Sequence, residues 1–362
     1  VGFDAIETYS TVHFDTAVRY LKEDPWERMR LIRQRVKKTP IRILGMSQSF
    51  SISRVLSDDV VELFNRTCAR NGTDEFWITA AMNDTRTSEV SIRTVKSMGL
   101  RADGGIQFTV SPVHTDEFFA NVAREFAAMG VDGIVVKDAS GLFTPERART
   151  LIPAVMAAAP GLPVIVHSHC VTGMGPAANL EAVAEGASAI WTCSQPLANG
   201  SSMPSGDSMT RHLSWLGYQV DTDPELQREI ADYWYAVAKR HDKPIGAPAE
   251  YDPAYYAHQM PGGMISNFEA QLDQLGLRHK LPAVLEDQPD LLYMIAGATH
   301  PALRRGSYRT LHAGQYTYAM GRALGDDKVI VAVNVSEKAQ KLEASVGDLY
   351  PDGTVLKALY GK

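Results

Sequence analysis

The sequence of 362 residues has few cysteines, no excess of basic charge and no long hydrophobic run. Its three cysteines, Cys68, Cys170 and Cys193, lie far apart without a CxxC pair, which excludes a disulfide framework and indicates a reducing compartment. The net charge of −6 leaves no basic face for a nucleic acid or an anionic membrane surface. Without a membrane-spanning apolar run or a signal peptide, we expect no membrane insertion and a cytoplasmic location.

The composition is that of an ordinary globular protein, with 45% hydrophobic and 22% charged residues. The length allows one large domain and a smaller one. The chain opens on Val1, inside an expected strand, which is consistent with a fragment of a longer protein.

Up to about Tyr218, short apolar runs alternate with longer amphipathic segments. Apolar strands buried on both faces that alternate with helices predict a parallel sheet with crossover helices. Seven such units in about 215 residues predict a (β/α)₈ TIM-type barrel that lacks its first strand–helix unit. The alternative is an open doubly wound sheet, although no Gly-rich dinucleotide-binding turn follows an early strand. The expected strands are residues 3–9, 41–46, 75–82, 105–110, 133–136, 163–166 and 189–193, and the expected helices are 26–36, 58–71, 89–98, 117–129, 145–158 and 176–185.

Three domains are expected along the chain. Residues 1–218 form the barrel, and residues 219–290 form a helical extension with helices at 224–240 and 267–275. In residues 300–362, alternating segments at 309–311, 315–322, 328–335 and 341–346 predict a small antiparallel β module.

The sharpest chemical signal is His167-Ser168-His169, which ends the apolar run before it. Side chains alternate along a strand, so both imidazoles point the same way, and the carboxyl end of a barrel strand is the mouth of the active site. Two such imidazoles can bind one divalent transition metal. An isolated HxH is more often structural, but its place at a strand end favours the metal site.

Lys137 ends the preceding strand, in the place equivalent to that of His167. A lysine there often only marks the edge of the sheet. Burial near a metal would lower the pKa of its amine, which could then act as a base or react with CO₂ to form a metal-binding carbamate. Asp84 is either a further carboxylate at the mouth or the N-cap of the next helix, and Cys170 is a less favoured nucleophile.

Several motifs in the right order make residues 1–285 resemble a known family. It is the carboxyltransferase domain shared by oxaloacetate decarboxylase α subunits, pyruvate carboxylase and transcarboxylase. The matching stretches are residues 2–7, 14–15, 21–28, 81–84, 108–115, 130–142 (with Lys137-Asp138), 167–174 (with His167-Ser168-His169) and 258–267 (with Gln259-Met260-Pro261-Gly262-Gly263).

The resemblance implies an enzyme in which carboxybiotin exchanges CO₂ with pyruvate or oxaloacetate. It implies a divalent metal (Zn, Mn or Co) held by His167, His169 and a carbamylated Lys137, with Gln48 and Asp84 contacting the substrate. The metal provides Lewis-acid stabilisation of the enolate. The chain has no Ala-Met-Lys-Met motif, so biotin is expected on another domain or chain, and the family's paired barrels imply a possible homodimer.

The chain also departs from the family pattern. The family's first strand, with an Arg-Asp pair and a Gln, would lie before Val1, and Met46 replaces the arginine of the loop that contains Gln48. The family's later Val-Thr-Pro-x-Ser-Lys segment is not recognisable after Leu285. From His300 onward the tail resembles the C-terminal β-sandwich of α-amylase-family glycoside hydrolases, which carries no catalytic carboxylates.

Three functional hypotheses follow. The favoured one is a metal-dependent carboxyltransferase or decarboxylase acting on a small 2-oxo acid. The second is a biotin-independent metal-dependent aldolase or lyase of the same barrel superfamily. The third is an inactive, truncated or chimeric protein joined near residues 286–299.

Overall fold

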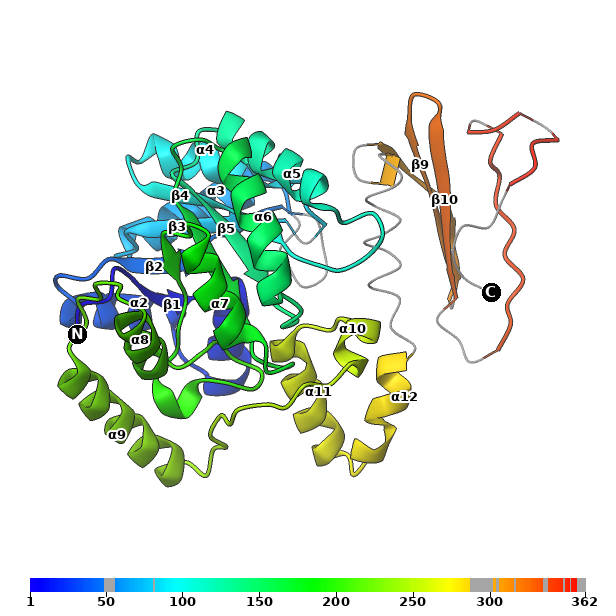
Figure 1. Cartoon of the computed structure of the whole chain (residues 1–362). Helices are drawn as coiled ribbons and strands as arrows, with labels where there is room; N and C mark the ends of the chain where they lie inside the picture. The colour runs from blue at the N-terminus through cyan, green and yellow to red at the C-terminus, as the bar shows by residue number, and fades with distance from the viewer. Residues whose placement is uncertain are drawn as a thin grey trace. The chain divides into compact units, whose positions relative to one another are not determined.

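The computed structural model describes residues 1–48, 56–80, 82–286, 302–303, 306–315, 317–334, 338–347, 349–351 and 353–356. The chain divides into two compact units, Val1–Asp287 and Gln288–Lys362 (Figure 1). Of the expected join near residues 286–299, only Glu286 lies within the described residues.

The first unit is built on a curled sheet of seven parallel strands in sequential order. The predicted barrel short of one strand–helix unit is therefore confirmed, and the doubly wound alternative is wrong because no strand is inserted out of order. The strands are β1 (Ile6–Tyr9), β2 (Ile41–Leu44), β3 (Glu75–Thr79), β4 (Arg101–Gln107), β5 (Gly133–Asp138), β6 (Val164–Ser168) and β7 (Ala189–Ile190).

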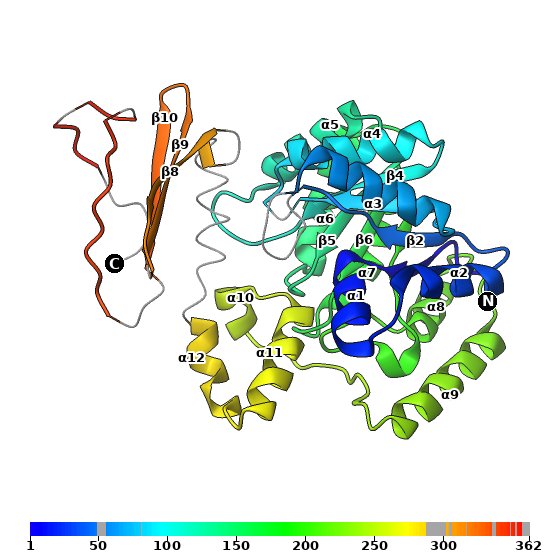
Figure 2. The same cartoon turned by 180° about the vertical axis from the view of Figure 1, so that it is seen from behind.

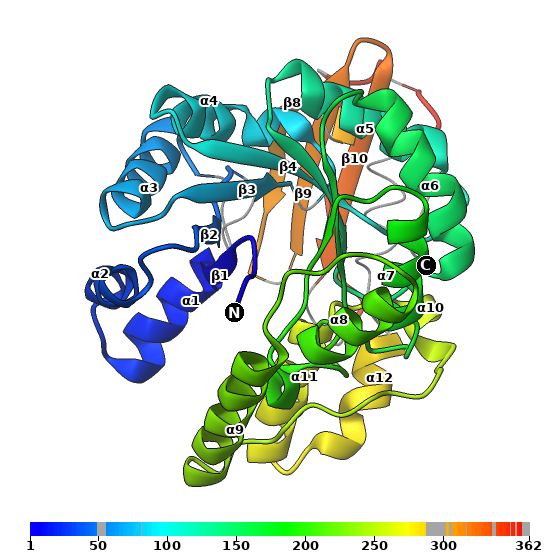
Figure 3. The ribbon, with the colours of Figure 1, turned by 60° about the vertical axis from the view of Figure 1, so that its left-hand side comes forward.

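Helices cover the outer face of this sheet, as Figure 3 shows. Most begin at a capping residue, for example Thr144, whose hydroxyl accepts a hydrogen bond from the Arg147 amide (3.2 Å) and whose successor Pro145 suits the first helical turn. The crossover segments contain α1 (Thr11–Thr16), a π-helical turn (Ala17–Leu21), α2 (Pro25–Arg35), α3 (Asp58–Arg70), a 3₁₀ turn (Thr85–Ser88), α4 (Glu89–Ser97), α5 (Asp116–Ala128), α6 (Pro145–Ala158) and α7 (Gly175–Ala184).

Further helices follow the last strand. Helix α9 runs beside the N-terminus (Figure 2), where the Asp223 amide donates to the carbonyl of Val1 (2.8 Å). The elements are a 3₁₀ turn (Gln195–Leu197), α8 (Gly206–Trp215), α9 (Pro224–Arg240), α10 (Ala254–His258), α11 (Gly262–Gln274), a second 3₁₀ turn (Arg278–Lys280) and α12 (Leu281–Glu286). No helix in the described part of the chain combines the length and the apolar character needed to span a bilayer.

The sheet has an apolar layer on each face. The larger core lies between the strands and the helices and contains Phe76, Phe119 and Phe126. A smaller cluster contains Leu44, Trp77, Val135 and Ile165, with Trp191 packed against it. Trp77, Val135 and Ile165 stand an even number of residues before the polar ends of their strands, so they share a face of the sheet with Thr79, Lys137 and His167.

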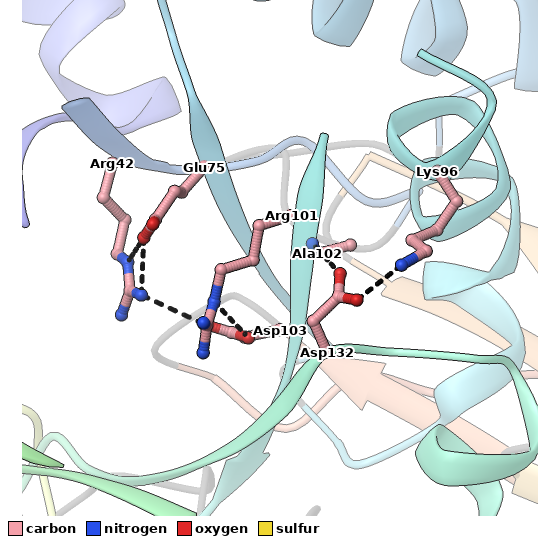
Figure 4. A network of polar contacts seen from close by, with 7 residues as sticks. All are labelled: Arg42, Glu75, Lys96, Arg101, Ala102, Asp103 and Asp132. Atoms are coloured by element: carbon pink, nitrogen blue, oxygen red, sulfur yellow. Dashed lines mark hydrogen bonds and ion pairs between the residues drawn. The ribbon is translucent and has the colours of Figure 1, made fainter. Parts of the chain in front are cut away.

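The amino ends of β2, β3 and β4 are joined by buried ion pairs (Figure 4). Arg42 lies 2.7 Å from Glu75 and 3.2 Å from Asp103, and Arg101 contacts the same Asp103 carboxylate at 3.1 Å. Burial raises the pKa of Asp103, and the two arginines oppose that shift. Breaking such a pair leaves an unpaired buried charge, at a cost of roughly 3–5 kcal/mol.

This polar layer explains why one strand boundary was predicted wrongly. The expectation placed the strand at residues 105–110, whereas β4 begins at Arg101 and ends at Gln107. Arg101 and Asp103 break the apolar pattern, but Asp103 pairs with Arg42 of β2 and with Arg101 of its own strand, so both charges are satisfied inside the sheet. Helix α11 likewise begins at Gly262 rather than Asn267, directly after Pro261.

The second unit contains a three-stranded antiparallel sheet in the order β10–β9–β8. The strands are β8 (Ser307–Ala313), β9 (Thr317–Leu324) and β10 (Asp327–Asn334), and the last two are joined by the tight turn Gly325-Asp326 with Gly325 at φ +58°. The predicted strand at residues 341–346 is wrong, because this alternating segment pairs with no strand of the described sheet. The likeness to an amylase-type β-sandwich stays a prediction.

Candidate metal centre at the carboxyl ends of β5 and β6

The structure places Lys137 and His167 directly opposite each other on neighbouring strands. They are register partners in the β5–β6 ladder, and Gln107 of β4 is the partner of Lys137 on its other side. Lys137 and His167 are each the second-last residue of their strand, and Gln107 is the last residue of its own, so the three lie at the carboxyl end of the sheet. His169 follows β6, two residues after His167.

His167 is a buried imidazole without a described hydrogen-bond partner. Only 6% of its surface is exposed, and neither ring nitrogen is hydrogen-bonded within the described part of the chain. Its ring centre lies 5.9 Å from that of Trp77 and 4.6 Å from that of Trp191. Burial, followed by the influence of His169 and Lys137, lowers the pKa of His167 well below its usual value, so the ring is neutral and offers a lone pair.

The ring of His169 is oriented by the main chain. Its Nδ1 lies 2.6 Å from the carbonyl oxygen of Ser201, so Nδ1–H donates and Nε2 keeps its lone pair. Burial lowers the pKa of His169 to about 4, and Lys137 acts in the same direction. The centres of the two imidazole rings are 5.1 Å apart, a separation at which both rings can bind the same ion.

Lys137 is half-buried beside these rings. Its Nζ lies 5.5 Å from the ring centre of Trp77. Burial lowers the pKa of the amine to about 8, whereas Glu7 favours the charged form. A substantial fraction of the amine is therefore neutral near physiological pH, which is the form that reacts as a nucleophile.

Glu7 is a site residue that the sequence reasoning missed. It lies on β1, opposite Arg42 in the register, and its charge acts on Lys137. Surrounding protein raises the pKa of Glu7 to about 7, against the influence of Arg42 and Lys137, although solvent still reaches the side chain. An acidic residue inside the first apolar run was the available signal.

These residues fit a divalent metal in part. Two neutral imidazoles, one of them with unsatisfied buried nitrogens, are suitable donors for Zn, Mn or Co. Within the described ranges, no group of three or more His, Cys, Asp and Glu side chains could hold a metal. A third donor from this region would therefore be Lys137, whose neutral amine can take up CO₂ to become a carbamate oxygen ligand.

Asp138 fixes the backbone that carries these candidate ligands. Its carboxylate accepts hydrogen bonds from the amides of Leu142 and Phe143 (both 2.9 Å) and from the hydroxyl of Ser168 (2.8 Å). Its carbonyl accepts from the His169 amide at 3.0 Å. Burial raises the pKa of Asp138 to about 6, and these hydrogen bonds oppose the shift.

The two predicted substrate contacts have protein partners. Asp84 caps the 3₁₀ turn and holds Arg86 in a two-pronged ion pair (2.9 and 2.8 Å), as the N-cap alternative anticipated. The side-chain amide of Gln48 donates to the Asp58 carboxylate, and the main-chain amide of Gln48 donates to the carbonyl of Thr87 (3.0 Å). Substrate binding by Gln48 and Asp84 stays a prediction.

Cys170 lies directly after the two histidines and is buried. Burial raises the pKa of its thiol to about 12, and Asp138 and Cys193 add to the shift. The thiol is therefore protonated at neutral pH, which disfavours the nucleophile.

Comparison with protein families gives two matches. Residues 4–200 match the family described as HMGL-like, and residues 255–295 match the one described as a conserved carboxylase domain. The first match contains every candidate metal ligand.

Several characterised proteins are similar in sequence. A pyruvate carboxylase subunit from Methanocaldococcus jannaschii is 36% identical over 80% of this chain and 51% of that protein. The 2-oxoglutarate carboxylase large subunit of Hydrogenobacter thermophilus is 33% identical over 80% of this chain and 45% of that protein. The methylmalonyl-CoA carboxyltransferase 5S subunit of Propionibacterium freudenreichii is 30% identical over 80% and 57%. The chain spans about half the length of the curated relatives it matches.

Solved structures agree with this similarity. The carboxyl transferase domain of Rhizobium etli pyruvate carboxylase with pyruvate and biocytin superposes with a TM-score of 0.73 at 29% identity, covering 82% of this chain and 50% of that one. A second structure of this domain superposes with a TM-score of 0.71 at 29% identity, covering 78% of this chain and 48% of that one.

Proposed function

The chain belongs to the HMGL-like family, and we propose that it catalyses metal-dependent carboxyl transfer to, or decarboxylation of, a small 2-oxo acid such as pyruvate or oxaloacetate. The observation that carries the proposal is the pair of neutral imidazoles, His167 and His169, beside the low-pKa amine of Lys137. The additional match to a carboxylase domain and the similarity to carboxylases and a carboxyltransferase support it.

Each residue has a distinct task in this proposal. His167 and His169 would hold the metal through ring nitrogens that are not protonated at neutral pH. The neutral amine of Lys137 could attack the carbon of CO₂: an N–C bond forms, one C=O π bond of CO₂ opens to give the carboxylate, and one N–H proton leaves to solvent. The carbamate would offer an oxygen as a further donor to the metal. When bound, the metal would act as a Lewis acid on the 2-oxo group of the substrate.

The partners follow from the same proposal. Biotin arrives as CO₂ carrier on another domain or chain, a homodimer is the expected assembly, and the cytoplasm is the expected location. We further propose that residues 1–218 are the catalytic barrel and that residues 219–290 are its helical extension. Gln48 and Asp84 are the proposed substrate contacts from the barrel.

The direct test is oxaloacetate decarboxylation measured with added Mn, Zn or Co and with free biotin. We expect metal-dependent turnover in the wild-type chain and a loss of at least about a hundredfold in Lys137→Ala, because a catalytic ligand is removed. Lys239→Ala, at the exposed end of α9, is the matched control and should retain full activity. Equal activity in the two variants would refute the role of Lys137.

A metal-dependent aldolase or lyase is the second candidate. The HMGL-like match covers the barrel and both histidines, and it does not depend on a biotin-dependent reaction. Carbon–carbon cleavage of 2-oxo acids in an assay without biotin separates the candidates. Cleavage of 4-hydroxy-2-oxo acids without decarboxylation of oxaloacetate would favour the lyase. Metal-free protein with neither activity would indicate an inactive chain.

A further inference from the structure

Gln259 adopts a backbone conformation that is unfavourable for its residue type. It directly follows α10 and has φ +50° and ψ 27°, in the left-handed region that glycine adopts most easily. Keeping a non-glycine residue in this conformation costs free energy, so the surrounding structure has to hold it there.

The side-chain amide of Gln259 binds the main chain about 150 residues earlier. Its Nε2 donates to the carbonyl of Val110 (2.6 Å), while its Oε1 accepts from the Val110 amide (3.0 Å) and from the Thr109 hydroxyl (2.7 Å). The amide therefore pairs with Val110 as a neighbouring strand would. This pattern needs one donor and one acceptor on the same group, which glutamate at neutral pH does not offer.

The main chain around Gln259 binds a second loop, the one that follows β5. The Ser140 hydroxyl donates to the carbonyl of Gln259 (2.6 Å), and the Gly262 amide donates to the carbonyl of Ala139 (2.9 Å). The hydroxyl of Tyr256 lies 3.4 Å from the carbonyl of Leu142. Three contacts thus attach residues 256–262 of the helical extension to residues 139–142.

Both attached segments flank Lys137. Ala139 and Ser140 follow it within three residues, and the Phe108 amide, next to Thr109, donates to the carbonyl of Lys137 itself (2.8 Å). Asp138 holds the same loop from the barrel side through Leu142, Phe143 and Ser168. The side chain of Gln259 is therefore hydrogen-bonded to the loop after β4, and its carbonyl to the loop after β5. Both loops adjoin the end of β5, which carries Lys137.

We infer that Gln259 is a positioning residue: by linking the loops after β4 and β5 to the helical extension, it holds Lys137 where its carbamate can join His167 and His169. This inference rests on the proposed function. It also gives the helical extension a role in the site, although none of the candidate metal ligands lies on it.

The test compares Gln259→Ala with Asp242→Ala in the full chain. Asp242 is an exposed residue after α9 with a similar left-handed φ of 48°, so both substitutions place alanine in the same strained backbone. Manganese affinity is measured by calorimetry with and without bicarbonate. We expect the wild type and Asp242→Ala to bind more tightly with bicarbonate, and Gln259→Ala to bind about tenfold more weakly with most of the bicarbonate effect lost.

A second measurement tests the hydrogen bonds around Gln259 in the absence of metal. Amide hydrogen exchange of Val110 and Gly262 should accelerate in Gln259→Ala and not in Asp242→Ala. In Gln259→Glu, the melting temperature relative to Gln259→Ala should rise as the pH is lowered, because only the protonated carboxyl can donate to Val110. Protonation is then favoured in the folded state, so this stabilisation is lost as the pH rises.

The possible failures are distinguishable. A wild-type chain that binds no manganese at any bicarbonate concentration refutes the proposed function and with it this role of Gln259. A wild type that binds manganese, with the same affinity and bicarbonate dependence in Gln259→Ala, refutes the positioning role alone. Unchanged exchange at Val110 would contradict the link itself.

Discussion

At the scale of single residues, the environment of Lys137 determines its chemistry. An ordinary lysine is almost fully protonated at pH 7 to 8 and reacts slowly with CO₂. Burial beside Trp77 lowers the pKa of Lys137 to about 8, and the nearby Glu7 limits the shift. Desolvation thus makes the Lys137 amine reactive, while Glu7 remains close enough to favour its charged form.

This pKa predicts a pH dependence of stability. Between pH 8 and 10.5 the unfolded chain still binds the proton on residue 137, whereas the folded chain has released it, so the destabilisation caused by burying this amine decreases as the pH rises. Lys137→Met should therefore be more stabilising at pH 8 than at pH 10.5. Urea unfolding of both proteins across this range measures the difference.

The exposed Lys239→Met provides the control, and its effect should not change over the same range. All five tryptophans lie before residue 288, so tryptophan fluorescence follows the first unit only. A constant stability difference between Lys137→Met and the wild type from pH 8 to 10.5 would show that the amine has an ordinary pKa.

At the scale of secondary-structure elements, side chains substitute for missing strand pairing at the mouth of the barrel. Asn83 has φ +54° and is buried. Its side-chain amide donates to the carbonyl of Gln107 (2.9 Å) and accepts from the Gln107 amide (2.7 Å). The end of β4, next to Lys137 in the register, is therefore held by the loop after β3.

Replacement of Asn83 tests that support. Asn83→Ala leaves two buried backbone groups of Gln107 unpaired and places alanine in the left-handed region, so we expect a loss of about 2–4 kcal/mol. Asn83→Gly removes the same hydrogen bonds without the backbone strain and should lose less. Urea unfolding followed by tryptophan fluorescence gives both values; a loss below about 0.5 kcal/mol in both variants would contradict this role.

The sequence predicted the elements better than the contacts between them. The apolar periodicity located all seven strands, and the turn and capping residues placed α6 and α9 at the bounds that were expected. The pairing of Lys137 with His167 followed from strand-end positions. Glu7, Asn83 and Gln259 were missed as supporting residues because their partners are distant in sequence or lie on irregular backbone, where periodicity gives no signal.

At the scale of the whole molecule, the chain separates into two units with different contents. Every candidate ligand and supporting residue lies in Val1–Asp287, which has its own large apolar core. The described strands of the second unit form an antiparallel sheet. This division predicts that the metal chemistry belongs to the first unit alone.

Deletion of residues 288–362 tests the division. We expect the shortened chain to keep the manganese affinity and the fluorescence-detected unfolding midpoint of the full chain, since neither the ligands nor the tryptophans are removed. The full chain measured under the same conditions is the reference. A loss of metal binding with an intact fold would assign part of the site to the second unit.

The central claim is that His167 and His169 bind a metal together with Lys137. Elemental analysis of the purified chain after incubation with Mn, Zn and Co and bicarbonate tests it most directly, beside the double variant His167→Ala/His169→Ala and the exposed control His212→Ala. The account predicts about one bound metal per chain in the wild type and in the control, and almost none in the double variant. The same metal content in all three proteins would contradict it.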